Sequence, residues 1–213
     1  MNPILKEIYH AILEGQHKQV EAKVQAALQA GINPKTILDE GMIAAMDEVG
    51  RLFESGDFYI PEMLVAARAM QSGLVVLKPH LKEANIQSAG KVAIGTVKGD
   101  LHDIGKNLVK MMLEGAGFEI LDLGTDVAPE KFVAVIQSGG VDILALSALL
   151  STTMSSMKDT INALKEAGVR EHVKVMIGGA PITEDYSKMI GADGFASDAS
   201  RAVALAKSFL AIR

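Results

Sequence analysis

The sequence predicts an α/β protein in which a four-helix bundle precedes a flavodoxin-like, doubly wound parallel sheet of five strands. Three observations support this fold class. Residues 1–84 show helical periodicity with almost no strand signal, residues 85–90 form a polar linker, and short apolar runs then alternate with helical patterns. We therefore expect two domains, a helical one at 1–88 and a Rossmann-like one at 89–213.

The front half places apolar residues at helical spacing in four stretches, 4–12, 20–28, 38–53 and 64–77. Asn33 and Pro34 suit the N-cap and first turn of the third helix, and Pro61 opens the fourth. Short links between the stretches predict a bundle. Met63 and Met70 are either core filler or a soft apolar lid over a flat ligand, and their spacing alone favours the core.

The back half alternates strand and helix signals. Parallel strands covered by helices on both faces are expected from this alternation. Ligands of such sheets bind at the carboxyl ends of the strands, so the loop 99–105, Ser147 and the pair Gly178-Gly179 should share one edge. We expect strands at 92–97, 118–123, 141–146, 173–177 and near 195, and helices at 104–115, 129–139, 153–167, 183–190 and 199–211.

Composition excludes several classes of function. A formal net charge of −5 and an aromatic content of 4% without Trp argue against a nucleic-acid partner. The lack of Cys excludes disulfides, thiolate zinc sites, iron–sulfur ligation and a Cys nucleophile. The first residues are charged, unlike a signal peptide, and no uninterrupted apolar run approaches the ~20 residues of a membrane span. We expect a cytoplasmic protein without a membrane partner.

The loop at 99–105 holds a histidine between carboxylates. Asp100 precedes His102 by two positions and could accept one imidazole N–H, which would make His102 either a better metal ligand or a better base. Asp103 has a simpler explanation as a cap for the helix that starts near Ile104. Gly105 would let a ligand approach the first helical turn closely.

The residues around this loop exclude several kinds of binding site. A hydrolytic zinc site needs about three protein ligands, and no further cluster of His, Asp or Glu is placed at the strand ends. Neither a Walker phosphate loop nor a Gly-x-Gly-x-x-Gly fingerprint follows the first strand. A metal at His102 would therefore have to bring its other ligands, as a tetrapyrrole-type macrocycle does.

The neighbouring strand ends carry small side chains. A cap for the next helix explains one hydroxyl, but the sequence has four close together, and these could bind a buried polar ligand. Gly178-Gly179 is either an ordinary turn or a slot for a long ligand. The four hydroxyl residues are Ser147, Ser151, Thr152 and Thr153.

Together these residues form a motif in three parts, Asp100-x-His102-x-x-Gly105, Ser147-x-Leu149 and Gly178-Gly179. The parts are separated by 41 residues (106–146) and 28 residues (150–177). Motif and spacings resemble the cobalamin-binding domain shared by methionine synthase, corrinoid-dependent mutases and the corrinoid proteins of methyltransferase systems. The front half is similar to the helical cap of the methyltransferase branch, so the resemblance covers nearly the whole chain.

The resemblance implies a role for each matching residue. His102 would replace the benzimidazole of cobalamin, or of a related corrinoid, as lower axial ligand of cobalt. Asp100 would hydrogen-bond His102, with Ser147 near that pair. Met63 and Met70 would cover the upper face of the corrin. The remaining cofactor-binding residues, which line the loop or the channel for the nucleotide tail, would be Leu101, Asp103, Ile104, Gly105, Leu149, Ser151, Thr152, Gly178 and Gly179.

The function implied by the resemblance is that of a methyl carrier with no catalytic residue of its own. A substrate-specific methyltransferase would supply the methyl group, and a second methyltransferase would pass it to an acceptor such as tetrahydrofolate or a thiol. A reductive activase would be a further partner. The alternatives are the cobalamin-binding subunit of a radical mutase, which normally lacks a helical cap, and a cobalamin-dependent sensor, which would need an output domain.

Overall fold

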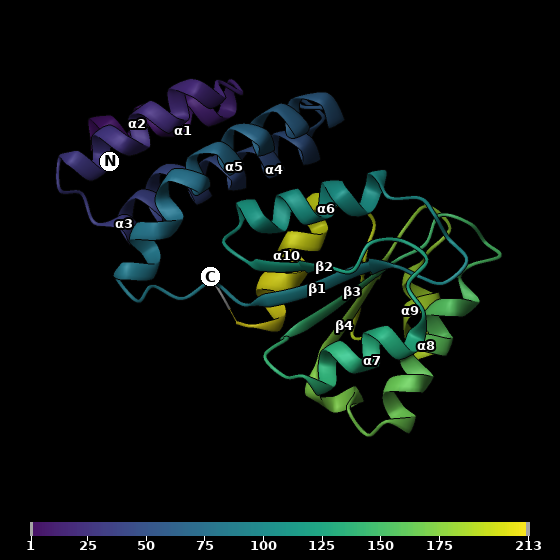
Figure 1. Cartoon of the computed structure of the whole chain (residues 1–213). Coiled ribbons are helices and arrows are strands. Elements are labelled where there is room, and N and C mark those ends of the chain that lie inside the picture. Colours follow the sequence, from purple (N-terminus) through teal and green to yellow (C-terminus); the bar gives the residue numbers. More distant parts are fainter. Residues whose placement is uncertain (1, 212–213) are drawn as a thin grey trace. The chain divides into compact units, whose positions relative to one another are not determined.

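The computed structural model describes residues 2–211, which fall into two compact units (Figure 1). The helical unit comprises Met1–Ser88 and Glu114–Gly117, and the sheet unit comprises Ala89–Leu113 and Phe118–Arg213. The chain thus changes architecture near residue 89, where the sequence changes from helical periodicity to short apolar runs.

The helical unit confirms the predicted bundle. The third predicted helix is a continuous stretch of α3, η1 and α4, and Asn33 caps its start by accepting a hydrogen bond from Lys35 N–H at 2.8 Å. Its middle, η1, is π-helical, which the apolar spacing did not predict. The elements are α1 (Pro3–Leu13), α2 (His17–Gln29), α3 (Pro34–Thr36), η1 (Ile37–Ile43), α4 (Ala44–Ser55) and α5 (Ile60–Glu83).

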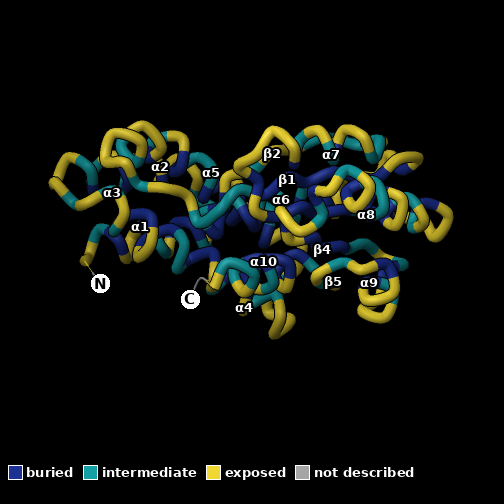
Figure 2. Tube along the Cα trace, turned by 90° about the horizontal axis from the view of Figure 1, so that it is seen from below, coloured by how far each residue is buried: buried dark blue, intermediate teal, exposed yellow. Residues whose placement is uncertain are grey.

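Helix α5 forms much of the core of the helical unit. One of its faces is buried, through Met63, Ala67, Met70 and Leu77 among others. Its length and composition would also suit a membrane span, yet 44% of that stretch is buried inside the chain. Such burial is what a core helix shows, and so length and apolarity here are weak evidence for a membrane. Figure 2 shows a comparable division between buried and exposed sides along α2 and α7.

The sheet unit is the predicted doubly wound parallel sheet. Its five strands have the order β2-β1-β3-β4-β5, and all the pairs are parallel. Helices alternate with the strands. The elements are β1 (Lys91–Thr96), α6 (Ile104–Gly115), β2 (Glu119–Asp122), α7 (Pro129–Gln137), β3 (Ile143–Ser147), α8 (Ser155–Glu166), η2 (Arg170–His172), β4 (Lys174–Gly178), α9 (Glu184–Ile190), β5 (Gly194–Ala196) and α10 (Ala199–Phe209).

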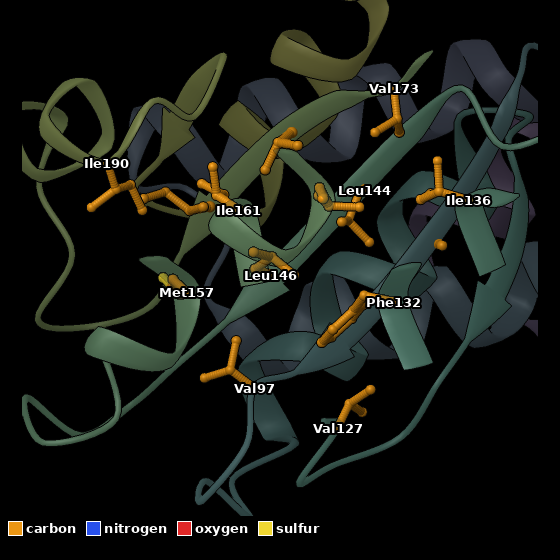
Figure 3. Packing of buried hydrophobic residues seen from close by; sticks show 14 of the residues in the cluster. Val97, Val127, Phe132, Ile136, Leu144, Leu146, Met157, Ile161, Val173 and Ile190 are labelled. Carbon is orange, nitrogen blue, oxygen red and sulfur yellow. The ribbon is translucent and has the colours of Figure 1, made fainter. Parts of the chain in front are cut away.

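Apolar packing holds helices against the sheet. Phe132 of α7, Ile161 of α8 and Ile190 of α9 pack in one buried cluster with Leu144 and Leu146 of β3 (Figure 3). Helices α6 and α10 lie on the opposite face (Figure 1). Burial of both faces explains why the central strands read as continuous apolar runs instead of alternating ones.

The strand register brings the predicted site residues to one edge. Thr96 of β1 pairs with Ser147 of β3, Ser147 with Gly178 of β4, and Gly178 with Ala196 of β5. These four residues are the last of their strands. The loops that follow them therefore leave the sheet side by side, as the sequence predicts.

Candidate functional site

The loop between β1 and α6 folds back on the end of its own strand. Asp100 N–H donates to the carbonyl oxygen of Val97 at 3.1 Å, which closes a turn at Gly99, where φ is +84°. Thr96 Oγ1 then donates to the carbonyl oxygen of His102 at 2.9 Å. The loop is thus fixed at both ends before α6 begins at Ile104.

Asp100 orients His102. Asp100 Oδ1 lies 2.8 Å from His102 Nδ1, as the sequence predicts. The carboxylate is fully buried, whereas half of the imidazole is exposed. With Nδ1 turned to the carboxylate, Nε2 is the nitrogen available to a ligand. A carboxylate in this place fixes the tautomer of a metal-binding histidine and increases its basicity.

The buried carboxylate of Asp100 collects several donors. His102 N–H donates to Oδ1 at 3.0 Å, while Leu149 N–H and Thr153 Oγ1 donate to Oδ2 at 2.8 Å and 2.7 Å. Leu150 N–H adds a longer contact of 3.3 Å to the same oxygen. Burial alone raises the pKa of Asp100, but the hydrogen bonds from Thr153, His102 and Leu149 hold it well below its usual range. Asp100 is therefore a carboxylate at neutral pH.

Thr153 supplies the hydroxyl at Asp100. The family resemblance implies that Ser147 lies near this pair and does not include Thr153 among the cofactor-binding residues. Ser147 instead meets the loop through its backbone, since its carbonyl oxygen accepts from Val97 N–H at 3.0 Å. Thr153 is buried in the turn that follows β3, where its Oγ1 also lies 2.9 Å from the carbonyl oxygen of Leu150, so that the two acceptors share one hydroxyl hydrogen. The surplus of hydroxyls at 147–153 was the signal that pointed to it.

Large apolar side chains lie exposed around His102. Leu101 and Ile104, on either side of it in sequence, are 72% and 80% exposed. Leu149 and Leu150, whose N–H groups bind Asp100, are 44% and 42% exposed. Several exposed apolar side chains beside a polar centre are typical of a ligand-binding surface. We call these four side chains the apolar rim.

The three glycines of the motif differ in whether the structure requires a glycine at their positions. A Cβ on Gly105 would meet no atom within 4 Å, and its φ is not positive, so neither packing nor backbone conformation requires glycine there. At Gly179 φ is +135°, and a Cβ would lie 1.8 Å from the carbonyl oxygen of Ala148. At Gly178 it would lie 2.9 Å from that of Ala196. Close approach of neighbouring backbones therefore explains the glycine pair, whereas Gly105 leaves open space.

The other predicted residues differ in how far they are buried and in what they contact. Ser151 and Thr152 are exposed in the turn after β3. Asp103 accepts a hydrogen bond from Asn107 Nδ2 at 3.0 Å, one turn into α6. Met63 and Met70 are fully buried in the helical unit, so contact with a cofactor would require them to become accessible, and their role as a cover stays a prediction.

The chain is similar to known proteins along both of its units. A B12 binding domain model matches residues 90–204, and a second B12 binding domain model matches residues 4–78. The chain belongs to the B12-binding family. Within this family it is 44% identical to dimethylamine corrinoid protein 1 of Methanosarcina acetivorans, over 98% of both chains. It is 42% identical to the trimethylamine corrinoid protein of Methanosarcina barkeri, over 97% of this chain and 96% of that one.

Two solved structures of cobalamin proteins have folds similar to that of this chain. The methanol:cobalamin methyltransferase complex MtaBC of Methanosarcina barkeri contains a chain that matches with a TM-score of 0.88 and 30% identity, over 99% of this chain and 80% of that one. A cobalamin-binding protein of Desulfitobacterium hafniense DCB-2 matches with a TM-score of 0.80 and 31% identity, over 96% and 98%. This B12-binding chain is accordingly a corrinoid protein of methyltransferase systems, with cobalamin or a related corrinoid as its cofactor.

Proposed function

We propose that the protein holds a corrinoid through His102 and carries a methyl group from one methyltransferase to another. The observation that supports this most strongly is the half-exposed imidazole of His102, whose Nδ1 is bound by the fully buried carboxylate of Asp100. Nε2 of His102 would bind the cobalt. When bound, the corrinoid supplies the nucleophilic cobalt that accepts and releases the methyl group.

The surroundings of His102 suit a flat macrocycle. The apolar rim would contact the lower face of the corrin, and the open space at Gly105 leaves room for the ring beside the first turn of α6. The displaced nucleotide tail would enter near Ser147, Leu149, Ser151, Thr152 and the Gly178-Gly179 pair. The role of the chain would be to position the cofactor, with His102 holding the cobalt.

The methyl donor would be bound by the partner enzyme. Methylated amines are the donor class with most support, because the sequence relatives described above are named for dimethylamine and trimethylamine. Transfer to a thiol or to tetrahydrofolate by the second methyltransferase, and rescue of oxidised cobalt by a reductive activase, complete the proposal.

The role of His102 is tested by spectroscopy on protein loaded with hydroxocobalamin and reduced to Co(II). We expect the electron paramagnetic resonance spectrum of the wild type to show coupling to one axial nitrogen. His102→Ala should abolish this coupling, whereas His172→Ala, which removes an exposed histidine of η2, should keep it. Nitrogen coupling that persists in His102→Ala, from protein and not from the benzimidazole, would falsify the assignment. Isotopic labelling of the protein histidines with 15N distinguishes the two sources.

A further inference from the structure

A residue outside the motif reaches the histidine loop from the next loop along the sheet edge. Asp126 lies between β2 and α7 and has φ of +52°, a left-handed conformation that is uncommon for a residue other than glycine. Asp and Asn tolerate this conformation better than other side chains. The conformation turns both the N–H and the side chain of Asp126 toward the loop after β1.

Asp126 makes two hydrogen bonds to adjacent residues of that loop. Its Oδ1 accepts from Gly99 N–H at 2.7 Å, and its own N–H donates to the carbonyl oxygen of Asp100 at 3.0 Å. The next residue, Val127, forms a parallel bridge with Val97. Asp126 therefore holds the backbone of Gly99 and Asp100 through hydrogen bonds. The Asp100 carboxylate is held separately, by hydrogen bonds from Thr153 and Leu149.

We infer that Asp126 is a positioning residue for the axial ligand, acting through Gly99 and Asp100 on His102. The inference rests on the proposed function, because it assumes that Nε2 of His102 meets cobalt. The physical reason is geometric. The Asp100 carboxylate binds the imidazole at Nδ1. The backbone turn that Asp126 holds sets where this carboxylate starts from, and the hydrogen bonds from Thr153 and Leu149 then hold its far oxygen. Loss of the Asp126 acceptor frees the Gly99 N–H and lets this turn move.

Three variants separate the acceptor from its conformation. Asp126→Gly permits the positive φ but removes the acceptor, whereas Asp126→Asn keeps both a side-chain oxygen and tolerance of this φ. The matched control is Asp142→Ala at the opposite end of β1. Asp142 Oδ2 accepts from Lys91 N–H at 2.8 Å and Asp142 N–H donates to the Lys91 carbonyl oxygen at 2.9 Å, so it makes the same pair of contacts away from His102.

The first measurement needs no corrinoid. Hydrogen exchange followed by NMR on the protein without cofactor should show the Gly99 amide exchanging about tenfold faster in Asp126→Gly, as expected for loss of a hydrogen bond to a charged acceptor. Asp126→Asn should stay within about threefold of the wild type. Asp142→Ala should accelerate exchange at Lys91 but not at Gly99.

The second measurement reports the ligand. In the cobalamin-loaded Co(II) protein, Asp126→Gly should lose the histidine nitrogen coupling in a substantial share of molecules, while Asp126→Asn and Asp142→Ala retain it. The inference is overturned if Asp126→Gly shows wild-type exchange and wild-type coupling, or if Asp126→Asn loses coupling to the same extent. Failure of the proposed function looks different, since wild-type protein would then already lack coupling that depends on His102.

Discussion

The two units of the chain bury different kinds of side chain. The described core of the helical unit is apolar, with Met42, Met63 and Met70 fully buried. All buried polar or charged side chains within residues 2–211 belong to the sheet unit: Thr96, Asp100, Lys106, Thr153, Thr160, Ser187 and Ser200. Three of them, Thr96, Asp100 and Thr153, hold the loop of His102. Buried polar groups thus hold a loop in one conformation through hydrogen bonds. Apolar packing alone is enough to hold the helices of the helical unit together.

The largest expected effect tests the apolar side of this contrast. Met70→Ala should lower the free energy of unfolding by about 2–5 kcal/mol, because a fully buried side chain leaves a cavity. Urea unfolding followed by far-UV circular dichroism measures the loss. Met189→Ala, at a side chain that is 72% exposed, is the control and should change stability by less than about 0.5 kcal/mol. Equal effects of the two substitutions would contradict the assignment of Met70 to a core.

The next effect concerns the polar support of the loop. Thr153→Val should cost about 2 kcal/mol, because it removes a hydrogen bond to the ionised carboxylate of Asp100 while keeping the side chain's shape. Thr153→Ser keeps the hydroxyl and should cost about half as much. Chemical denaturation at neutral pH distinguishes them. A valine variant as stable as the wild type would show that the hydroxyl contributes nothing to the hold on Asp100.

Acid should weaken the sheet unit through its ion pairs. Burial alone raises the pKa of Asp122, but hydrogen bonds from Lys106, Gly124 and Lys110 lower it to about 2. A depressed pKa in the folded state means that this stabilisation is present above the unfolded-state pKa of about 4 and is lost as the pH falls toward 2. We expect a contribution of about 1 kcal/mol, because solvent at the edge strand screens the pair.

This pH dependence can be isolated with Asp122→Asn. Its unfolding free energy should fall less steeply between about pH 4 and 2 than that of the wild type. In the helical unit the pKa of Glu48 is also lowered, by its hydrogen bonds from Arg51. The Arg51 side chain is 61% exposed, so solvent screens this pair and Glu48→Gln should change the slope less than Asp122→Asn does. Identical slopes for wild type and Asp122→Asn would refute the role of this ion pair.

Substitution of His102 should have the smallest effect on the free energy of unfolding, although we expect it to have the largest effect on cofactor binding. His102→Ala should lower the free energy of unfolding of the protein without corrinoid by at most about 1 kcal/mol, less than Thr153→Val, because water can replace the half-exposed imidazole at the Asp100 carboxylate. Parallel thermal melts with and without hydroxocobalamin measure this. A loss of several kcal/mol without cofactor would mean that His102 is chiefly a structural residue.

The sequence predicted those features that depend on local pattern or on strand ends. Helix and strand positions follow from apolar spacing and from Gly and Pro breakers, and the register then places Thr96, Ser147 and Gly178 in one row. The hydrogen bond between Asp100 and His102 was predictable because the two lie two positions apart.

Other features depend on contacts that spacing does not encode. The choice of Thr153 over Ser147 as partner of Asp100 depends on how the turn after β3 folds back on the loop. Lys106 is buried because Asp122, on the following strand, lies 2.8 Å from its Nζ. Asp126 has no motif of its own, and its role becomes visible only when two loops separated in sequence lie side by side. The π-helical stretch η1 keeps the same apolar faces as an α-helix would, so periodicity gave no sign of it.

The apolar rim also affects the solubility of the protein. Leu101, Ile104, Leu149 and Leu150 are exposed, and exposed apolar side chains that lie close together promote self-association. A corrinoid seated on them would remove that surface from water and favour the folded state by mass action. A bound corrinoid would then protect the protein against self-association as well as stabilise its fold.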